Sequence, residues 1–337
     1  MTGYVVRRFL WLIPVVLTVA TVTFLLTSLT PGGPWDKEKR LPAVARRNLD
    51  AKFGLDKPRW FNPEAAAAKR AAGVDNPLTL ARAYLDSQYF NYLFGLCRFD
   101  LGPSYQSKGT ESVQSIIRER FSVSMRVGLV ALAFSLLVGL PLGALGALRQ
   151  HTWLDYTSVV TSTIGISIPS FVIGLLLIIL LRAQFGISPI RRPEAWGGLG
   201  PAYLLPGVVL GLGTMAIVAR LTRAGLLEIK RQDYVRAARA KGLGEARIVA
   251  RHMAGNALIP IVTIIGPATA ELLTGSIVVE AIFGVPGLGR EFVSSIDARD
   301  YSLIMGTTLF YAVLIALANV LVDLSYGLLD PRIRVGR

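Results

Sequence analysis

Six long apolar segments constrain the fold of this 337-residue chain more than any other feature. A helix that crosses the bilayer core needs about 20 mostly apolar residues. The segments that meet this length lie, to within a few residues, at 9–30, 123–148, 159–181, 202–219, 257–282 and 303–328. Hydrophobic residues make up 52% of the chain and charged residues 17%. The sequence therefore predicts an all-α integral membrane protein with six transmembrane helices.

The net charge of +14 would suggest nucleic-acid binding in a soluble protein. Here the apolar segments argue against that function, and we expect no nucleic-acid partner. Cys97 is the single cysteine, so the chain forms no intramolecular disulfide. His151 and His252 are too few and too far apart in sequence to indicate a zinc site.

Basic residues in the short loops indicate the orientation, because Lys and Arg resist transfer across the membrane. With both termini in the cytoplasm, the inside loops carry fifteen basic residues and the short outside loops four. The inside residues are Arg7, Arg8, Arg149, the nine between 220 and 251, Arg332, Arg334 and Arg337; the outside residues are Arg191, Arg192, Arg290 and Arg299. We expect the first segment to be an uncleaved anchor, because no small-residue cleavage site follows it.

The spans divide the chain into three parts: the first helix (1–30), an extracytoplasmic helical insertion (31–122) and a five-helix core (123–337). Within the insertion, the stretches LPAVARRNLDAKFGLD and PEAAAAKRAAG favour helix, and Gly54 and Gly73 stand where C-terminal caps are expected. The stretch ESVQSIIRERF has an apolar stripe at helical spacing. It predicts either an interfacial helix before the second span or a helix packed on neighbouring protein.

A polar hairpin at 220–256 separates the fourth and fifth spans. The stretch EIKRQDYVRAARAKG favours a helix that ends at Gly242, and EARIVARHMAGNA favours a second, short helix. The basic residues alone would be explained by orientation in the membrane. A helical pair of more than thirty residues is longer than a simple connection needs, however, and suggests a docking surface for a partner protein.

Several residues inside the spans are candidates for packing or function. Two glycine pairs at four-residue spacing suit close helix contacts, and three prolines are expected to bend their helices: Gly139 with Gly143, Gly207 with Gly211, and Pro141, Pro169 and Pro267. Glu271 stands about midway along the fifth segment, where a charge costs ~2.5–3.5 kcal/mol. Glu271 is expected either to line a transport pathway or to pair with a buried hydroxyl or a partner permease. Glu280 and Asp323 stand near span ends and are expected at interfaces.

The hairpin YVRAARAKGLGEARIVARHMAGNALIPIV resembles the cytoplasmic coupling loop of ABC importer permeases, especially the oligopeptide, dipeptide and nickel branch. Four other stretches resemble the same branch: RRFLWLIPVVLTVATVTFLLTSLTPGGP, FGLCRFDLGPSYQSKGTESV, ELLTGSIVVEAIFGVPGLGREFVSSIDARDYSLI and the terminal LLDPRIR. The chain departs from the family in Arg236, which replaces the usual glutamate, in Glu271, and in a longer stretch at 58–89.

The resemblance implies a non-catalytic permease subunit that forms half of a pathway for di- or oligopeptides in a bacterial inner membrane. It implies a second permease, two ABC ATPases that hold ATP and Mg²⁺, and an extracytoplasmic binding protein; this chain is expected to bind no cofactor. The ATPase would contact the coupling helix, formed by Asp233, Tyr234, Val235, Arg236, Ala237, Ala238, Arg239, Ala240, Lys241 and Gly242.

The sequence argues against three other functions: an ATPase, a secondary transporter or channel, and a membrane hydrolase. The chain lacks the G-x-x-x-x-G-K-[ST] phosphate loop, so it has no ATPase site of that kind. A secondary transporter or channel would show intramembrane charge relays or internal repeats, and the sequence has one mid-span acid and no clear repeat. A membrane hydrolase is disfavoured because both histidines fall in cytoplasmic loops. Nickel complexes or saccharides remain alternative substrates.

Overall fold

In the computed structural model, residues 2–36, 42–190, 193–198 and 200–329 are described. All regular elements in these ranges are helices, as predicted. Of the basic residues in the charge count, Arg191, Arg192, Arg332, Arg334 and Arg337 lie outside the described residues, as does most of the terminal LLDPRIR motif. Asp323 lies on a helix, but its side chain is not described.

Within the described ranges, four helices are long and apolar enough to cross a membrane: Val6–Leu29, Val113–Leu148, Pro201–Ile229 and Tyr301–Leu321. Two bent helix pairs raise the number of candidate spans to six if each pair is one span. The long helices are α1 (Thr2–Leu29), α6 (Val113–Leu148), α9 (Leu204–Ile229) and α16 (Tyr301–Leu329). The six-span topology and the cytoplasmic termini remain predictions.

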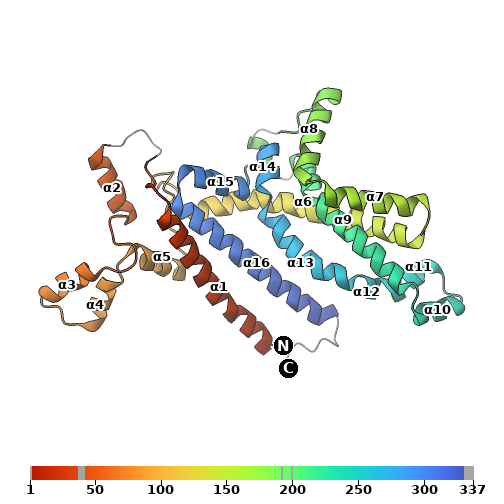
Figure 1. The fold of residues 1–337 in the computed structure, drawn as a ribbon, viewed down its shortest axis with the longest axis horizontal. Helices are drawn as coiled ribbons and strands as arrows, with labels where there is room; N and C mark the ends of the chain where they lie inside the picture. The colour runs from red at the N-terminus through yellow and green to blue at the C-terminus, as the bar shows by residue number, and fades with distance from the viewer. Residues whose placement is uncertain (1, 37–41, 191–192, 199, 330–337) are drawn as a thin grey trace. The chain divides into compact units, whose positions relative to one another are not determined.

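The third and fifth apolar segments are each interrupted. The bend predicted at Pro169 is confirmed, the break in the fifth segment is not predicted by the sequence, and Pro141 and Pro267 lie inside single helices. The third is α7 (Trp153–Ser167) followed by α8 (Ser170–Phe185), bent by 102° at Pro169 (Figure 1). Proline disfavours helical geometry in the residue before it, and Ile168 is extended, with φ −96° and ψ 123°. The fifth is α13 (Ile259–Thr274), a break at Gly275, and α14 (Ile277–Phe283). Gly275 has φ +80°, which interrupts the helix.

The second and fourth apolar segments belong to longer helices than the sequence predicts. The stretch ESVQSIIRERF is not a separate helix but the first turns of α6, because no glycine or proline separates Val113 from the span. Helix α9 continues past Ala219 to Ile229, so ten residues assigned to the cytoplasmic hairpin extend the fourth helix. Arg220 and Arg223 therefore lie on α9 rather than in a loop.

The paired glycines form the contact between α6 and α9. A Cβ atom on Gly143 would lie 2.3 Å from the carbonyl oxygen of Ala219, and one on Gly139 would lie 2.8 Å from that of Met215. From the other side, a Cβ atom on Gly211 would lie 2.6 Å from the carbonyl oxygen of Ala131. The predicted role of these glycines in close helix packing is confirmed.

Gly143→Ala is expected to destabilise the protein by about 1–3 kcal/mol, because the added methyl group overpacks the contact between α6 and α9. Gly213→Ala is the matched control: its Cβ atom would have no neighbour closer than 3.9 Å. Thermal unfolding of the detergent-solubilised variants measures the difference. Equal unfolding temperatures for the two variants would show that this helix contact tolerates the extra volume.

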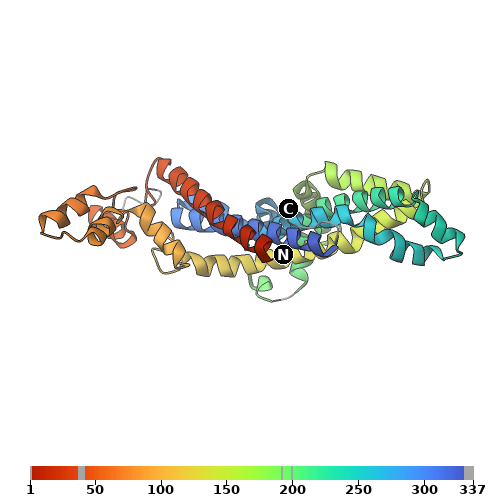
Figure 2. The ribbon, with the colours of Figure 1, turned by 90° about the horizontal axis from the view of Figure 1, so that it is seen from below.

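The chain separates into two compact units. Unit 1 comprises residues 1–12, 120–290 and 313–337, and unit 2 comprises residues 13–119 and 291–312. In unit 2, four short helices form the insertion predicted as a helical lobe: α2 (Ala43–Phe53), α3 (Pro63–Ala71), α4 (Pro77–Tyr84) and α5 (Gln88–Cys97). Helices α3 and α4 lie side by side (Figure 2). Gly54 and Gly73 adopt φ +68° and +78° and end α2 and α3 as predicted.

Unit 2 also contains α15 (Leu288–Ala298) from Glu291 onward and the first turns of α16. A buried carboxylate joins these turns to the segment before α6. Asp300 accepts hydrogen bonds from the Ser104 hydroxyl at 2.5 Å, from the Gln106 N–H at 3.1 Å and from the Leu303 N–H at 3.1 Å. The last of these bonds caps the start of α16. The three-part division of the chain predicted from the spans stays a prediction.

Candidate functional site

A helical hairpin follows α9 at one end of unit 1 (Figure 1). It consists of α10 (Asp233–Ala240), α11 (Glu245–Ile248), a π-helical segment (Val249–Met253) and α12 (Ala254–Ala257). Gly242 reverses the chain between α10 and α11 with φ +77°, the left-handed conformation expected of it. Its N–H donates to the carbonyl of Arg239 at 2.9 Å, which closes the last turn of α10.

One face of α10 is buried within this chain. Val235 is 0% exposed and Ala238 is 6% exposed. They belong to a hydrophobic cluster with Ala147, Leu226, Ile229, Ile248, Met253 and Ala257, contributed by α6, α9, α11, the π-helical segment and α12. Two of the ten residues predicted to contact a partner therefore hold the helix on its own membrane base.

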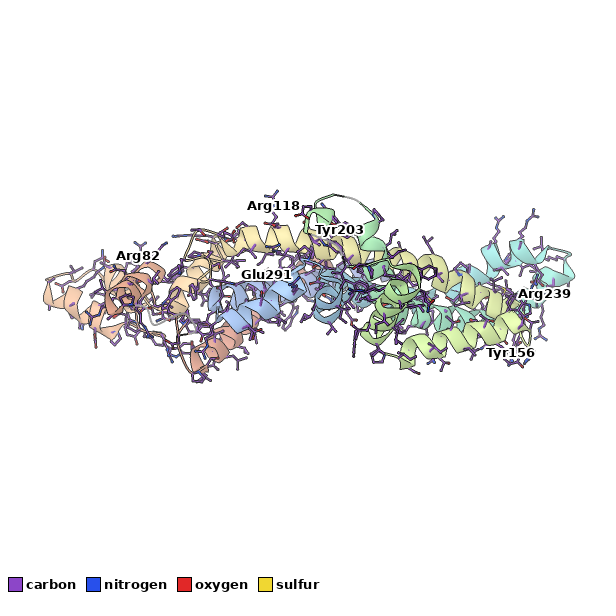
Figure 3. The ribbon with its side chains drawn as sticks, turned by 90° about the horizontal axis from the view of Figure 1, so that it is seen from above. Arg82, Arg118, Tyr156, Tyr203, Arg239 and Glu291 are labelled. Atoms are coloured by element: carbon purple, nitrogen blue, oxygen red, sulfur yellow. The ribbon has the colours of Figure 1, made fainter. Side chains whose placement is uncertain are left out.

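The opposite face of α10 is open. Its side chains at Asp233, Tyr234, Arg236, Ala237, Ala240 and Lys241 are exposed. Arg236 pairs with Asp233 on the same face, and Tyr234 accepts a hydrogen bond from the Asn256 amide at 3.1 Å. Arg239 forms an ion pair with Glu245 at 2.6 Å, which links α10 to α11 across the turn (Figure 3 labels Arg239). The hairpin thus presents a short, positioned helix rather than a flexible loop.

A buried carboxylate forms a second site in unit 1. Glu280 on α14 is 1% exposed and accepts a hydrogen bond from the Ser124 hydroxyl of α6 at 2.7 Å. Its other oxygen accepts from the N–H of Arg290 at 2.8 Å, and Ser124 in turn accepts from the N–H of Leu288 at 2.8 Å. These bonds fix the segment that follows α14 to Ser124 of α6.

Glycines make room for this carboxylate. A Cβ atom on Gly287 would lie 2.4 Å from the Glu280 carboxyl group, and one on Gly275 would lie 2.2 Å from it. The Ser124 hydroxyl and the Arg290 N–H satisfy this buried carboxylate, one on each oxygen. The sequence prediction placed Glu280 at an interface. The structure instead places it inside the chain, because residues 124 and 287–290 fold over it.

Glu271, the predicted pathway residue, is exposed on the last turn of α13. Its carbonyl accepts a hydrogen bond from the Thr274 hydroxyl at 2.7 Å. The break at Gly275 places Glu271 near a helix end rather than in the middle of a long helix. The structure does not bring Glu271 together with the hairpin, so the predicted site residues form two separate groups.

Comparison with known proteins identifies the class. Residues 139–335 match the family of binding-protein-dependent transport system inner membrane components. The chain belongs to this family, and is thus a multi-pass protein of the inner membrane.

Its relatives include permeases of peptide transport systems. The chain is 38% identical to the dipeptide transport system permease protein DppB of Bacillus subtilis, over 99% of both chains. It is 34% identical to the oligopeptide transport system permease proteins OppB of Haemophilus influenzae and Escherichia coli K12, over 99% of this chain and 100% of each relative. The family predicted from the hairpin motif is confirmed.

Proposed function

We propose that this chain is a permease subunit of an ABC importer for di- or oligopeptides. The observation that carries the proposal is the full-length similarity to DppB and OppB, 38% and 34% identical over 99% of this chain. Peptide transport is favoured over transport of nickel complexes or saccharides, because the relatives compared are named for peptides. The chain would form half of the pathway, and a second, homologous permease the other half.

The exposed face of α10 is the proposed contact for an ATPase subunit. Its geometry supports this role: Val235 and Ala238 anchor the helix while Tyr234 and Arg236 project outward. A helix held on a hydrophobic base moves together with that base, so a displacement of the partner is transmitted to α9 and α12 as a rigid-body shift. ATP and Mg²⁺ belong to the ATPase subunits in this proposal.

Glu271 is proposed as a pathway residue. Its exposure within the isolated chain leaves its carboxylate available to a substrate ammonium group or to the second permease. The helical insertion, on the opposite side of the membrane from the hairpin in the predicted topology, faces the compartment from which a binding protein delivers the substrate. The proposed function therefore gives the insertion and the hairpin different partners.

The decisive experiment measures the ATPase rate of the purified complex in lipid vesicles with its binding protein. We expect binding protein loaded with a di- or oligopeptide to raise the rate severalfold over the unloaded protein. The control is the same binding protein offered a saccharide or a nickel complex. Stimulation by one of those ligands and not by peptide would contradict the proposed substrate, and a complex without any ATPase would contradict the proposed class.

A further inference from the structure

A polar cavity lies in unit 2, between the last turns of α1, helices α2 and α5, and the first turns of α16 (Figure 1). Its volume is about 560 Å³, within the ~300–1,000 Å³ range of small-molecule sites. All the residues that line it belong to this unit. In the predicted topology the helical insertion is extracytoplasmic, so the cavity is reached from the compartment in which the substrate arrives.

Asp50 and Arg59 bring opposite charges to this cavity without pairing with each other. Asp50 accepts a hydrogen bond from the Trp35 indole N–H at 3.0 Å, and Arg59 donates to the Ser28 carbonyl at 2.9 Å. Trp35 and Ser28 line the cavity as well, so these bonds hold both charged groups at its wall. Neither Asp50 nor Arg59 forms an ion pair with a described residue. The cavity thus carries one carboxylate and one guanidinium group that lack a partner of opposite charge.

Polar atoms at the wall are open rather than sealed by the protein. The Tyr105 hydroxyl and the Gln88 side-chain oxygen make no hydrogen bond within the described residues, although the Gln88 amide nitrogen donates to two backbone carbonyls at 3.0 and 2.7 Å. One Asp50 oxygen is likewise unused, since the indole bond occupies the other. Arg46 also lines the cavity but is engaged, because it pairs with Asp36 at 3.3 Å. A ligand therefore meets unused acceptors and a hydroxyl in addition to the two charges.

Aromatic side chains supply apolar surface beside these charges. Phe24 and Trp35 line the cavity, and each is 5% exposed. Tyr105 and Tyr301 line it too. Aromatic rings combine a large apolar area with a defined geometry, so they can hold an apolar side chain of a ligand. The cavity therefore suits a molecule that has an apolar side chain and carries one positive and one negative charge.

We infer that this cavity binds a short zwitterionic peptide, with the ammonium group of the ligand at Asp50 and its carboxylate at Arg59. Hydrogen bonds between ionised partners are the strong ones, and the planar guanidinium group matches the geometry of a carboxylate. The inference rests on the proposed function for the supply of peptides outside the membrane. It adds a peptide site in unit 2, whereas the proposed pathway residue Glu271 belongs to unit 1.

Isothermal titration calorimetry of the complete transporter in nanodiscs tests the inference. The probe is the dipeptide Phe-Ala, titrated without binding protein and without ATP. N-acetyl-Phe-Ala lacks the ammonium group, and Phe-Ala amide lacks the carboxylate. We expect each modified peptide to bind roughly tenfold more weakly than Phe-Ala, because each leaves one charged residue of the cavity without its partner.

Substitutions should remove this discrimination one charge at a time. Asp50→Asn keeps an acceptor for Trp35 and is expected to bind Phe-Ala and N-acetyl-Phe-Ala with equal affinity, while it still prefers the free carboxylate. Arg59→Gln is expected to bind Phe-Ala and its amide equally and to keep the preference for the free ammonium group. Asp56→Asn and Arg47→Gln are the matched controls, because both residues are exposed in the same unit and do not line the cavity. Both controls should bind all three peptides as the unmodified protein does.

Three results would overturn the inference. The first is the absence of Phe-Ala binding at millimolar concentration, and the second is equal binding of Phe-Ala and both modified peptides. The third is binding that Glu271→Gln abolishes while Asp50→Asn and Arg59→Gln leave it unchanged, which would assign the peptide to the pathway residue.

Free phenylalanine separates a peptide site from an amino-acid site, because it carries both charges without a peptide bond. We expect it to bind more weakly than Phe-Ala, and equal affinity would overturn the assignment to peptides. The readout also separates this inference from the proposed function. If peptide-loaded binding protein raises the ATPase rate but Phe-Ala does not bind to the cavity, the inference fails and the proposed function stands.

Discussion

Gly242→Val is expected to abolish the association of this chain with its ATPase partner and to lower peptide uptake at least tenfold. Gly242 has φ +77°, a conformation that a β-branched residue adopts only under strain. A Cβ atom at this position would have no neighbour within 4 Å, so the expected loss comes from the backbone and not from a clash. The strain is relieved when α10 and α11 separate, which removes the exposed face of α10 from its position.

Gly242→Asn is the matched control, because asparagine tolerates the left-handed conformation better than other non-glycine residues. We expect Asn to retain most of the ATPase in a co-purification experiment. Gly54→Val supplies a second control: Gly54 has φ +68° at the end of α2, which belongs to unit 2, and its substitution should leave ATPase binding intact. Equal ATPase binding in Gly242→Val and Gly242→Asn would rule out the turn as the element that positions α10.

The second large effect is expected from Glu280→Ala, which should lower the free energy of unfolding by about 3 kcal/mol or more. The substitution leaves the Ser124 hydroxyl and the Arg290 N–H without acceptors in a buried site, and each unsatisfied group costs ~1–3 kcal/mol. It also opens a cavity beside Gly287. Thermal unfolding of the purified transporter measures the loss, and peptide uptake should fall with it as the segment 284–290 loosens.

Glu280→Gln should cost less than Glu280→Ala, because the amide keeps the volume and one oxygen acceptor. Glu271→Gln serves as the control for stability: Glu271 is exposed, so this variant should unfold at the temperature of the unmodified protein while its uptake reports on the proposed pathway role. If Glu280→Ala unfolds at the same temperature as Glu280→Gln, the hydrogen bonds of the carboxylate contribute little to the stability of the protein.

The hairpin and the segment after α14 are held in unit 1 by different kinds of interaction. The hairpin rests on a hydrophobic cluster that includes Ile248 and Met253, both 0% exposed. The segment after α14 is held by hydrogen bonds to a carboxylate that α14 itself provides. A buried hydrogen-bond network whose groups are satisfied holds one geometry. We therefore expect the segment 284–290 to keep its local structure during transport.

Several features that depend only on neighbouring residues could be predicted from the sequence. Runs of about 20 apolar residues predict membrane helices whatever they pack against, because lipid requires each segment to satisfy its own backbone. Glycines placed after helix formers predicted the left-handed turns at Gly54, Gly73 and Gly242, because only local backbone geometry is involved. The hairpin and its family followed from the same local pattern.

Tertiary structure settled the features that depend on residues far apart in the chain. Glu280 is buried because Ser124, 156 positions earlier, meets it, and no local pattern reports that contact. The break at Gly275 was decided likewise, and prolines alone do not locate such breaks, since Pro141 and Pro267 stand inside single helices whereas Pro169 lies at a 102° bend. Whether a polar group in a membrane helix is paired, exposed or left facing a cavity depends on which helix packs beside it, and that choice is made only when the helices assemble.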